Sequence, residues 1–173
     1  MRHISAALPL LLAATPPATA DIEPIVRLDN PAAVALTLRE EGFRAKLAKD
    51  DYGQPEILSG TGGTIFVIRF FGCQQGVNCE SLLFSVGFEF DQGFPFSPIN
   101  EWNADALMGR AYLDEHCDVY LDHFILADPE QSIAQFLKEL DQWSGVVEDF
   151  REHIGFDQDD PVAVATCEGD PVL

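Results

Sequence analysis

The chain has 173 residues, of which 29 are aspartate or glutamate and 10 are lysine or arginine, so its formal net charge is −19. A surface this acidic repels phosphate backbones and anionic lipid headgroups, which makes nucleic acids and membrane surfaces poor candidate partners. The length suits one domain with a substantial hydrophobic core.

The first twenty residues predict a secretory signal peptide. Arg2 gives a short basic start, residues 4–14 are apolar, and Ala18-Thr19-Ala20 is a small-residue cleavage site. The apolar run is too short to span a bilayer. We therefore expect cleavage after Ala20 and a soluble, periplasmic or secreted protein with no membrane span. Removing Arg2 leaves 9 basic against 29 acidic side chains, so the mature formal charge is −20.

The region after the signal peptide predicts one helix and then four strands. Asn30 and Pro31 suit a helix start, and Gly42 suits its end. Residues 43–60 predict two short strands around a turn at 50–55.

Two more apolar strands are predicted at 62–72 and 80–90. The strand at 62–72, "GGTIFVIRFFG", is apolar enough to be covered on both faces.

The second half of the chain predicts a short helix, two strands and a long helix. Ser97-Pro98 suits the start of the short helix and Gly109 its end. Strands at 110–114 and 117–126 follow, joined by a tight turn at 114–116. The long helix runs from Asp128-Pro129-Glu130 to Gly155 and has an apolar stripe that predicts a core-facing side, made of Ile133, Phe136, Leu137, Leu140, Trp143, Val147, Phe150 and Ile154.

This order of elements predicts an α+β fold. Helices are too few to cross over between every pair of strands, which favours a twisted antiparallel sheet carrying an N-terminal, a short middle and a long C-terminal helix. We expect the signal peptide at 1–20, one α+β domain at 21–155 and an acidic tail at 156–173.

Four cysteines allow three disulfide pairings in an exported protein. Cys73 and Cys79 flank a turn between two strands, so we predict a bridge across this hairpin. Elimination then pairs Cys117 with Cys167, a bridge that would strap the tail to the last hairpin. Zinc binding and a redox pair are disfavoured, because the spacing is neither that of a zinc knuckle nor a C-x-x-C motif.

No arrangement of residues predicts catalysis. His116, Cys117, Asp118, Asp122 and His123 crowd one hairpin, but Asp122 and His123 should point to opposite faces of a strand, so the ligands of a metal would not converge. A serine-hydrolase motif is absent from the sequence, and the glycine-rich residues 59–63 lack the lysine of a phosphate-binding loop. We expect no catalytic residue, no metal site and no cofactor.

Residues 99–150 resemble the signature half of the YbjN-like family. In these proteins an N-x-W-N helix leads to an R-A-Y-L-D strand, a hairpin with an L-x-x-D-type strand, and a long helix that contains L-x-x-W and a late phenylalanine. The matching residues here are Asn100, Trp102, Asn103, Arg110, Tyr112, Leu113, Asp114, Leu121, Trp143 and Phe150. The resemblance extends over roughly residues 30–154.

The resemblance implies a fold similar to type III secretion chaperones and a sensory or regulatory role without catalytic residues. It leaves room for a protein or peptide partner and for a homodimer. From the residues, we expect the two tryptophans near the core, the two asparagines on strand or hairpin backbone, and Arg110 paired with Asp114 or Asp122. The leading hypothesis is a non-enzymatic, exported binding or regulatory module. The alternatives are a periplasmic protein that binds a small ligand or metal and, less favoured, an unrecognised hydrolase.

Overall fold

The computed structural model describes residues 23–91 and 93–157. The expected signal peptide and cleavage site, most of the expected acidic tail, and Cys167 therefore lie outside the described residues. Within those two ranges, no helix combines the length and apolar character needed to cross a bilayer.

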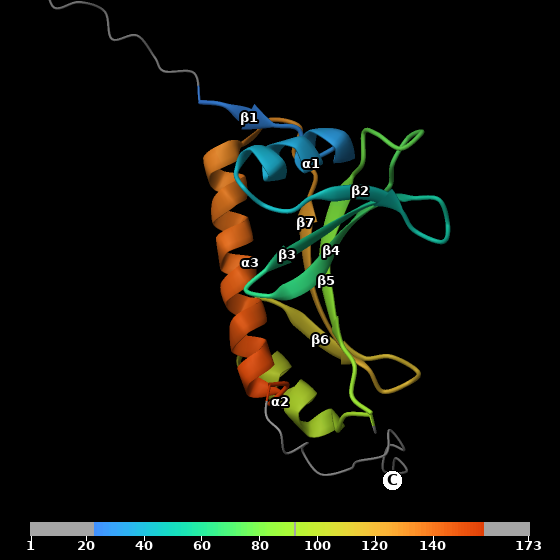
Figure 1. Cartoon of the computed structure of the whole chain (residues 1–173), viewed down its shortest axis with the longest axis vertical. Coiled ribbons are helices and arrows are strands. Elements are labelled where there is room, and N and C mark those ends of the chain that lie inside the picture. The colour runs from blue at the N-terminus through green and yellow to red at the C-terminus, as the bar shows by residue number, and fades with distance from the viewer. Residues whose placement is uncertain (1–22, 92, 158–173) are drawn as a thin grey trace, which may run out of the picture.

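Six strands form one antiparallel sheet in the order β2-β3-β4-β5-β7-β6. The predicted antiparallel α+β class is therefore confirmed (Figure 1). The strands are β2 (Lys46–Lys49), β3 (Pro55–Thr61), β4 (Thr64–Phe71), β5 (Ser81–Phe88), β6 (Arg110–Leu113) and β7 (Val119–Leu126).

Three helices accompany the sheet: α1 (Pro31–Glu40), α2 (Phe96–Asp105) and α3 (Ile133–His153). Figure 1 shows α1 and α3 on one side of the sheet and α2 at its lower end, below β6. Among the described residues, no helix lies over the opposite side of the sheet. The molecule therefore has one covered face and one open face.

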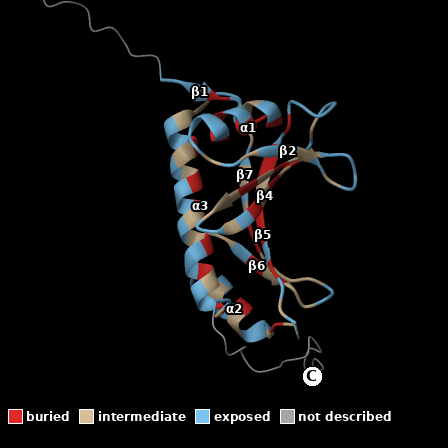
Figure 2. Cartoon of the chain, in the orientation of Figure 1, coloured by how far each residue is buried: buried red, intermediate tan, exposed pale blue. Residues whose placement is uncertain are grey.

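The core fills the space between the covered face and the helices (Figure 2). Trp143 of α3 is fully buried and meets Phe66, Phe84 and His123 at ring-centroid distances of 6.1, 5.9 and 6.4 Å. The predicted stripe of α3 is confirmed as core, because Phe136, Leu140, Val147, Phe150 and Ile154 are also buried. Burial of such side chains is worth about 1.5–3 kcal/mol each.

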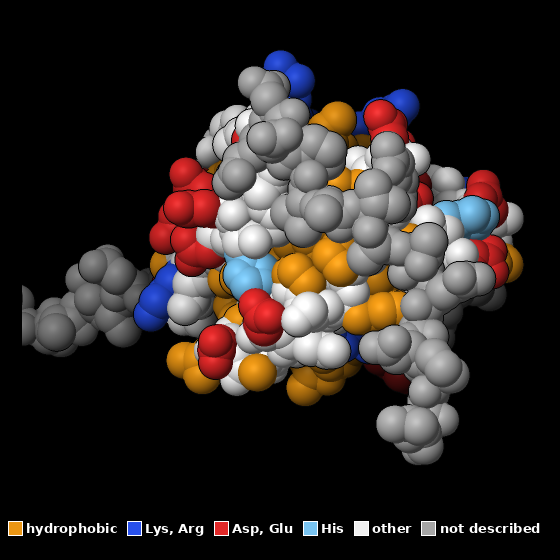
Figure 3. Space-filling model, turned by 90° about the horizontal axis from the view of Figure 1, so that it is seen from below, with side chains coloured by type: hydrophobic (Ala, Val, Ile, Leu, Met, Phe, Trp, Pro, Cys, Tyr) orange, Lys and Arg blue, Asp and Glu red, His pale blue; other side chains and the backbone are white. Residues whose placement is uncertain are grey.

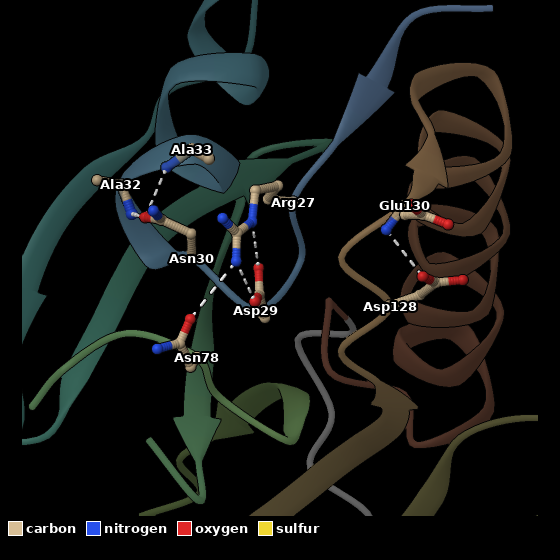
Figure 4. Close-up of polar contacts among 8 residues, drawn as sticks. All are labelled: Arg27, Asp29, Asn30, Ala32, Ala33, Asn78, Asp128 and Glu130. Atoms are coloured by element: carbon tan, nitrogen blue, oxygen red, sulfur yellow. Dashed lines mark hydrogen bonds and ion pairs between the residues drawn. The ribbon is translucent and has the colours of Figure 1, made fainter. Parts of the chain in front are cut away.

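The start of α1 is capped as the sequence predicts (Figure 4). Asn30 Oδ1 accepts hydrogen bonds from the backbone N–H groups of Ala32 and Ala33, at 3.0 and 3.2 Å. Just before the cap, Arg27 pairs with Asp29 and also donates to Asn78, 51 residues away. These contacts fasten the start of α1 to the hairpin between β4 and β5.

The long helix begins later than the sequence predicts. Residues 131–132 form a short strand, β8 (Gln131–Ser132), which pairs with β1 (Ile25–Val26), a strand that the sequence did not indicate. The hydroxyl of Ser132 then caps α3 by accepting from Gln135 N. The Asp128 side chain accepts from Glu130 N instead, which makes a turn before the helix.

The short helix is also shifted. It begins at Phe96 and ends at Asp105, and the predicted cap Ser97 hydrogen-bonds Glu101 inside the helix. Gly109 does not end the helix. It has a φ of +84° and turns the chain into β6.

The prediction that residues 62–72 are covered on both faces is wrong. Phe66, Ile68 and Phe70 of β4 are buried under the helices, whereas Ile65 and Phe71 are exposed on the other side. The run is apolar on both faces although only one is covered, so apolar side chains remain on the open face.

Candidate functional site

Two side chains of α2 hold the residues before and inside β6. The Asn103 amide donates to Ala111 O and accepts from Ala111 N, both at 2.9 Å, and so takes the place of a neighbouring strand along the free edge of β6. Trp102 Nε1 donates to Gly109 O at 2.9 Å, and its ring packs against Phe150. The expected backbone role is therefore seen for Asn103, whereas Asn100 is exposed and bonds nothing through its side chain in the described residues.

β6 and β7 place a polar and aromatic cluster on the open face. Arg110 pairs with Asp122 at 3.2 Å, so the structure selects Asp122 from the two predicted partners. Asp122 is only 4% exposed, and its Oδ1 lacks a hydrogen-bond partner among the described residues. The guanidinium carbon of Arg110 lies 5.1 Å from the centroid of the Tyr112 ring, close enough for a cation–π contact.

Tyr112 and Tyr120 stack face to face across the two strands, with ring centroids 5.4 Å apart. Burial raises the pKa of Tyr112 above its ordinary value, and the negative charge of Asp122 adds to the shift. Burial likewise raises the pKa of Tyr120, with contributions from Asp114 and Asp118. Both hydroxyls therefore stay protonated well above neutral pH.

The other end of the open face is apolar. Phe71, Phe124 and Leu126 are 47%, 55% and 72% exposed, respectively. The strand register places Phe71 and Leu126 on either side of Ser81, and sets Phe124 beside Leu83. We call these four residues, Phe71, Leu83, Phe124 and Leu126, the apolar patch. Arg69 lies beside the patch, because it pairs with Leu83 across the sheet and lies in the same row of residues as Phe124.

The predicted bridge between Cys73 and Cys79 is present. It closes the hairpin just beyond the ends of β4 and β5, at the margin of the apolar patch. Cys117 is also disulfide-bonded and has a φ of +67°, a conformation that glycine adopts more readily. Because Cys167 lies outside the described residues, the pairing of Cys117 with Cys167 stays a prediction.

The crowded hairpin does not assemble a metal site. In the part of the chain that the structure describes, no three histidine, cysteine, aspartate or glutamate side chains are placed to share an ion. Asp122 faces Arg110 on the open face, whereas His123 lies under α3, where its Nε2 is 3.2 Å from Glu139 Oε1. His116 hydrogen-bonds through its backbone to Asp114 in the exposed turn.

His153 links two helices. Its Nε2 donates to Pro98 O at 2.8 Å and so holds α3 against α2. Viewed from this end, hydrophobic side chains reach the surface among acidic ones (Figure 3). A groove of about 450 Å³ between the helices contains Trp102, Leu107, Met108 and Val146.

The fold and the open face together define a class: an α+β protein whose six-stranded antiparallel sheet leaves an aromatic and apolar face accessible. The chain belongs to the YbjN family, whose model, described as "Putative bacterial sensory transduction regulator", matches residues 30–156. The family is thus described as a regulator and is not known as an enzyme family. Among curated proteins no relative matches the chain.

The apolar patch is the part of the site that sequence reasoning missed. Of its four residues, only Phe71 falls in the strand that was predicted to be covered on both faces, and no surface role was predicted for the other three. The polar residues Arg69, Ser81 and Ser85, which alternate with apolar ones on β4 and β5, indicated that one face is more polar. Gly87 was a second signal, because a Cβ there would lie 2.9 Å from the Tyr120 ring. A glycine inside a strand often marks such a close approach.

Proposed function

We propose that this YbjN-family protein is an exported, non-catalytic regulatory module that binds a protein segment on the open face of its sheet. The observation that carries the proposal is the apolar patch, in which three large side chains are about half or more exposed. Contiguous exposed apolar surface on a folded domain commonly marks a binding site.

The occupant proposed is a partner protein that presents an apolar segment flanked by polar groups. Apolar side chains of the partner would cover Phe124 and Leu126. Its hydrogen-bonding groups would meet the hydroxyls of Tyr112 and Tyr120, which are partly exposed. Aromatic and arginine side chains are the types that contribute most to protein interfaces, and the open face combines both.

Export rests on the sequence of the first twenty residues and on the disulfide hairpin. Disulfides persist in oxidising compartments, and Cys73–Cys79 is one. An exported protein cannot act as a cytoplasmic secretion chaperone. The resemblance to the chaperone fold nevertheless motivates the proposed binding role. Fractionation of cells and N-terminal sequencing test the location, and a mature chain beginning at Asp21 is the expected result.

Site-specific photo-crosslinking in the native host tests the binding face. A benzophenone side chain replaces Phe124 in one variant and Tyr52 in a control variant. Tyr52 is 89% exposed and lies in the turn between β2 and β3, and β4 and β5 separate this turn from Phe124 on β7. We expect one defined protein adduct from position 124 and none from position 52. An adduct with a second copy of this chain would indicate a homodimer in place of a different partner protein. Identical labelling from both positions would refute the binding face.

A further inference from the structure

A second surface lies at the other edge of the sheet, away from β6. A groove of about 800 Å³ runs between the end of α1, the following loop and the turn joining β3 to β4. Its floor includes Leu58, Ser59 and the glycine-rich residues 60–63. A groove of this volume is within the range that accommodates ligands.

The charge of this groove is opposite to that of the molecule. Three of the chain's 10 lysines and arginines, Arg39, Arg44 and Lys46, line it, and none of its described lining residues is acidic. Glu40 and Glu41 stand in the same stretch of chain but outside the lining. None of the three cations forms an ion pair within residues 23–91 and 93–157, although acidic residues outnumber basic ones nearly threefold.

The groove also borders an unpaired strand edge. β2 pairs with β3 from Pro55 to Leu58 only, so residues 59–61 of β3 have no described strand on that side. Ser59 is buried, and its Oγ has no hydrogen-bond partner among the described residues. Arg39 donates to Ala45 O at 3.0 Å, which holds the loop on the opposite wall. An open edge with a fixed wall is the geometry that strand addition requires.

We propose that this groove binds an extended acidic segment of a partner protein, which adds a short strand along residues 59–61. Backbone groups of the segment would pair with the free edge of β3. Carboxylates on alternate residues would meet Arg44 and Lys46 on one side, because side chains of a strand alternate. The groove is separate from the apolar patch. A negative binding result at one surface therefore does not contradict the proposal for the other.

Fluorescence anisotropy with the mature full-length protein tests this proposal. The probe is a short fluorescein-labelled peptide of alternating glutamate and valine, and the comparison peptide alternates lysine and valine. We expect only the acidic peptide to bind, with an affinity that falls as salt rises. Reversal of charge at Arg44 and Lys46, by Arg44→Glu and Lys46→Glu together, should weaken binding about tenfold or more.

Lys138→Glu is the control for overall charge, because Lys138 is exposed on α3 and outside the lining of the groove. Its reversal adds two negative units of charge, half of the four that the double variant adds. Amide chemical shifts of the unmodified protein give a second readout that needs no variant. The amide signals of residues 59–61 should shift when the peptide is added. Equal weakening by Lys138→Glu, or shifts that avoid residues 59–61, would overturn the proposal. Binding seen only after removal of residues 158–173 would also overturn it, because the acidic tail would then be the occupant.

Discussion

At the scale of single residues, the family signature is explained by backbone pairing. Asn103 supplies a donor and an acceptor to one residue of an edge strand, and Trp102 supplies a donor to the glycine that precedes that strand. Both contacts fix where β6 begins. They thereby fix which side of the sheet Arg110 and Tyr112 occupy.

Asn103→Ala should lower the free energy of unfolding by about 1–3 kcal/mol, because it leaves both backbone groups of Ala111 without their partner. Urea unfolding measures the loss. Asn100→Ala is the matched control, since Asn100 lies on the same helix and is exposed, and its loss should stay within about 0.5 kcal/mol. Equal losses from the two variants would show that the Asn103 contacts do not set the stability of β6.

The stacked tyrosines predict a loss of stability at alkaline pH. Because the pKa values of Tyr112 and Tyr120 are raised in the folded protein, the unfolded chain releases these protons first. Their contribution is complete below the ordinary tyrosine value of about 10 and is lost as pH rises through the raised values.

Urea unfolding between pH 9 and 11 measures this loss. We expect the unfolding free energy to fall over this range, and to fall less steeply in Tyr112→Phe. An unchanged slope in that variant would contradict the assignment.

At the scale of elements, the packing of α3 against the sheet leaves two glycines in contrasting surroundings. A Cβ on Gly109 would lie 2.9 Å from Val146 Cγ1 and 3.1 Å from Leu121 Cδ1, and the residue has a φ of +84°. A Cβ on Gly145 would meet nothing within 4 Å, inside α3.

Gly109→Ala should therefore destabilise the protein by at least about 1 kcal/mol, since it combines strain with a close contact. Gly145→Ala should stabilise it by up to about 1 kcal/mol, because alanine favours a helix interior. Thermal unfolding of the two variants gives shifts of opposite sign. Thermal shifts of the same sign in the two variants would contradict the close contact between α3 and the turn before β6.

The disulfide hairpin should also contribute stability. Its seven-residue loop predicts a gain of about 2 kcal/mol from restriction of the unfolded chain. Removing both cysteines, by Cys73→Ala and Cys79→Ala together, should lower the unfolding free energy by this amount under non-reducing conditions. The single variant Cys73→Ala serves as the control and should lose as much, because the bridge rather than either side chain is responsible. No loss in either variant would refute this contribution.

Much of this element order could be predicted from the sequence. The cap at Asn30, the stripe of α3 and the hairpin cysteines depend on neighbours in the chain, and each is found as expected. The short strands β1 and β8 depend on each other across more than one hundred residues, and so no local pattern indicated them. The exposure of one sheet face was missed for the same reason. Whether a strand residue is buried depends on which helices pack against the sheet and not on the strand alone.

At the scale of the whole molecule, the proposed function depends on the acidic charge and on the open face of the sheet. A net charge of −19 keeps the surface well hydrated, while the cations Arg69 and Arg110 lie among aromatic and apolar side chains on the open face. The open face therefore combines basic, aromatic and exposed apolar side chains. The exposed apolar patch within it is the reason that the sheet face is proposed to meet the partner.

Native mass spectrometry is the measurement that tests this central claim most directly. Protein isolated from its host without reduction would be compared with a double variant, Phe124→Thr and Leu126→Thr, which keeps strand-forming residues but removes the exposed apolar surface. Leu47→Thr, on the covered side of the sheet edge, is the matched control. We predict a stoichiometric protein companion for the wild type and for the control, and a bare monomer for the double variant. The same companions, or the same bare monomer, in all three samples would contradict binding at the open face.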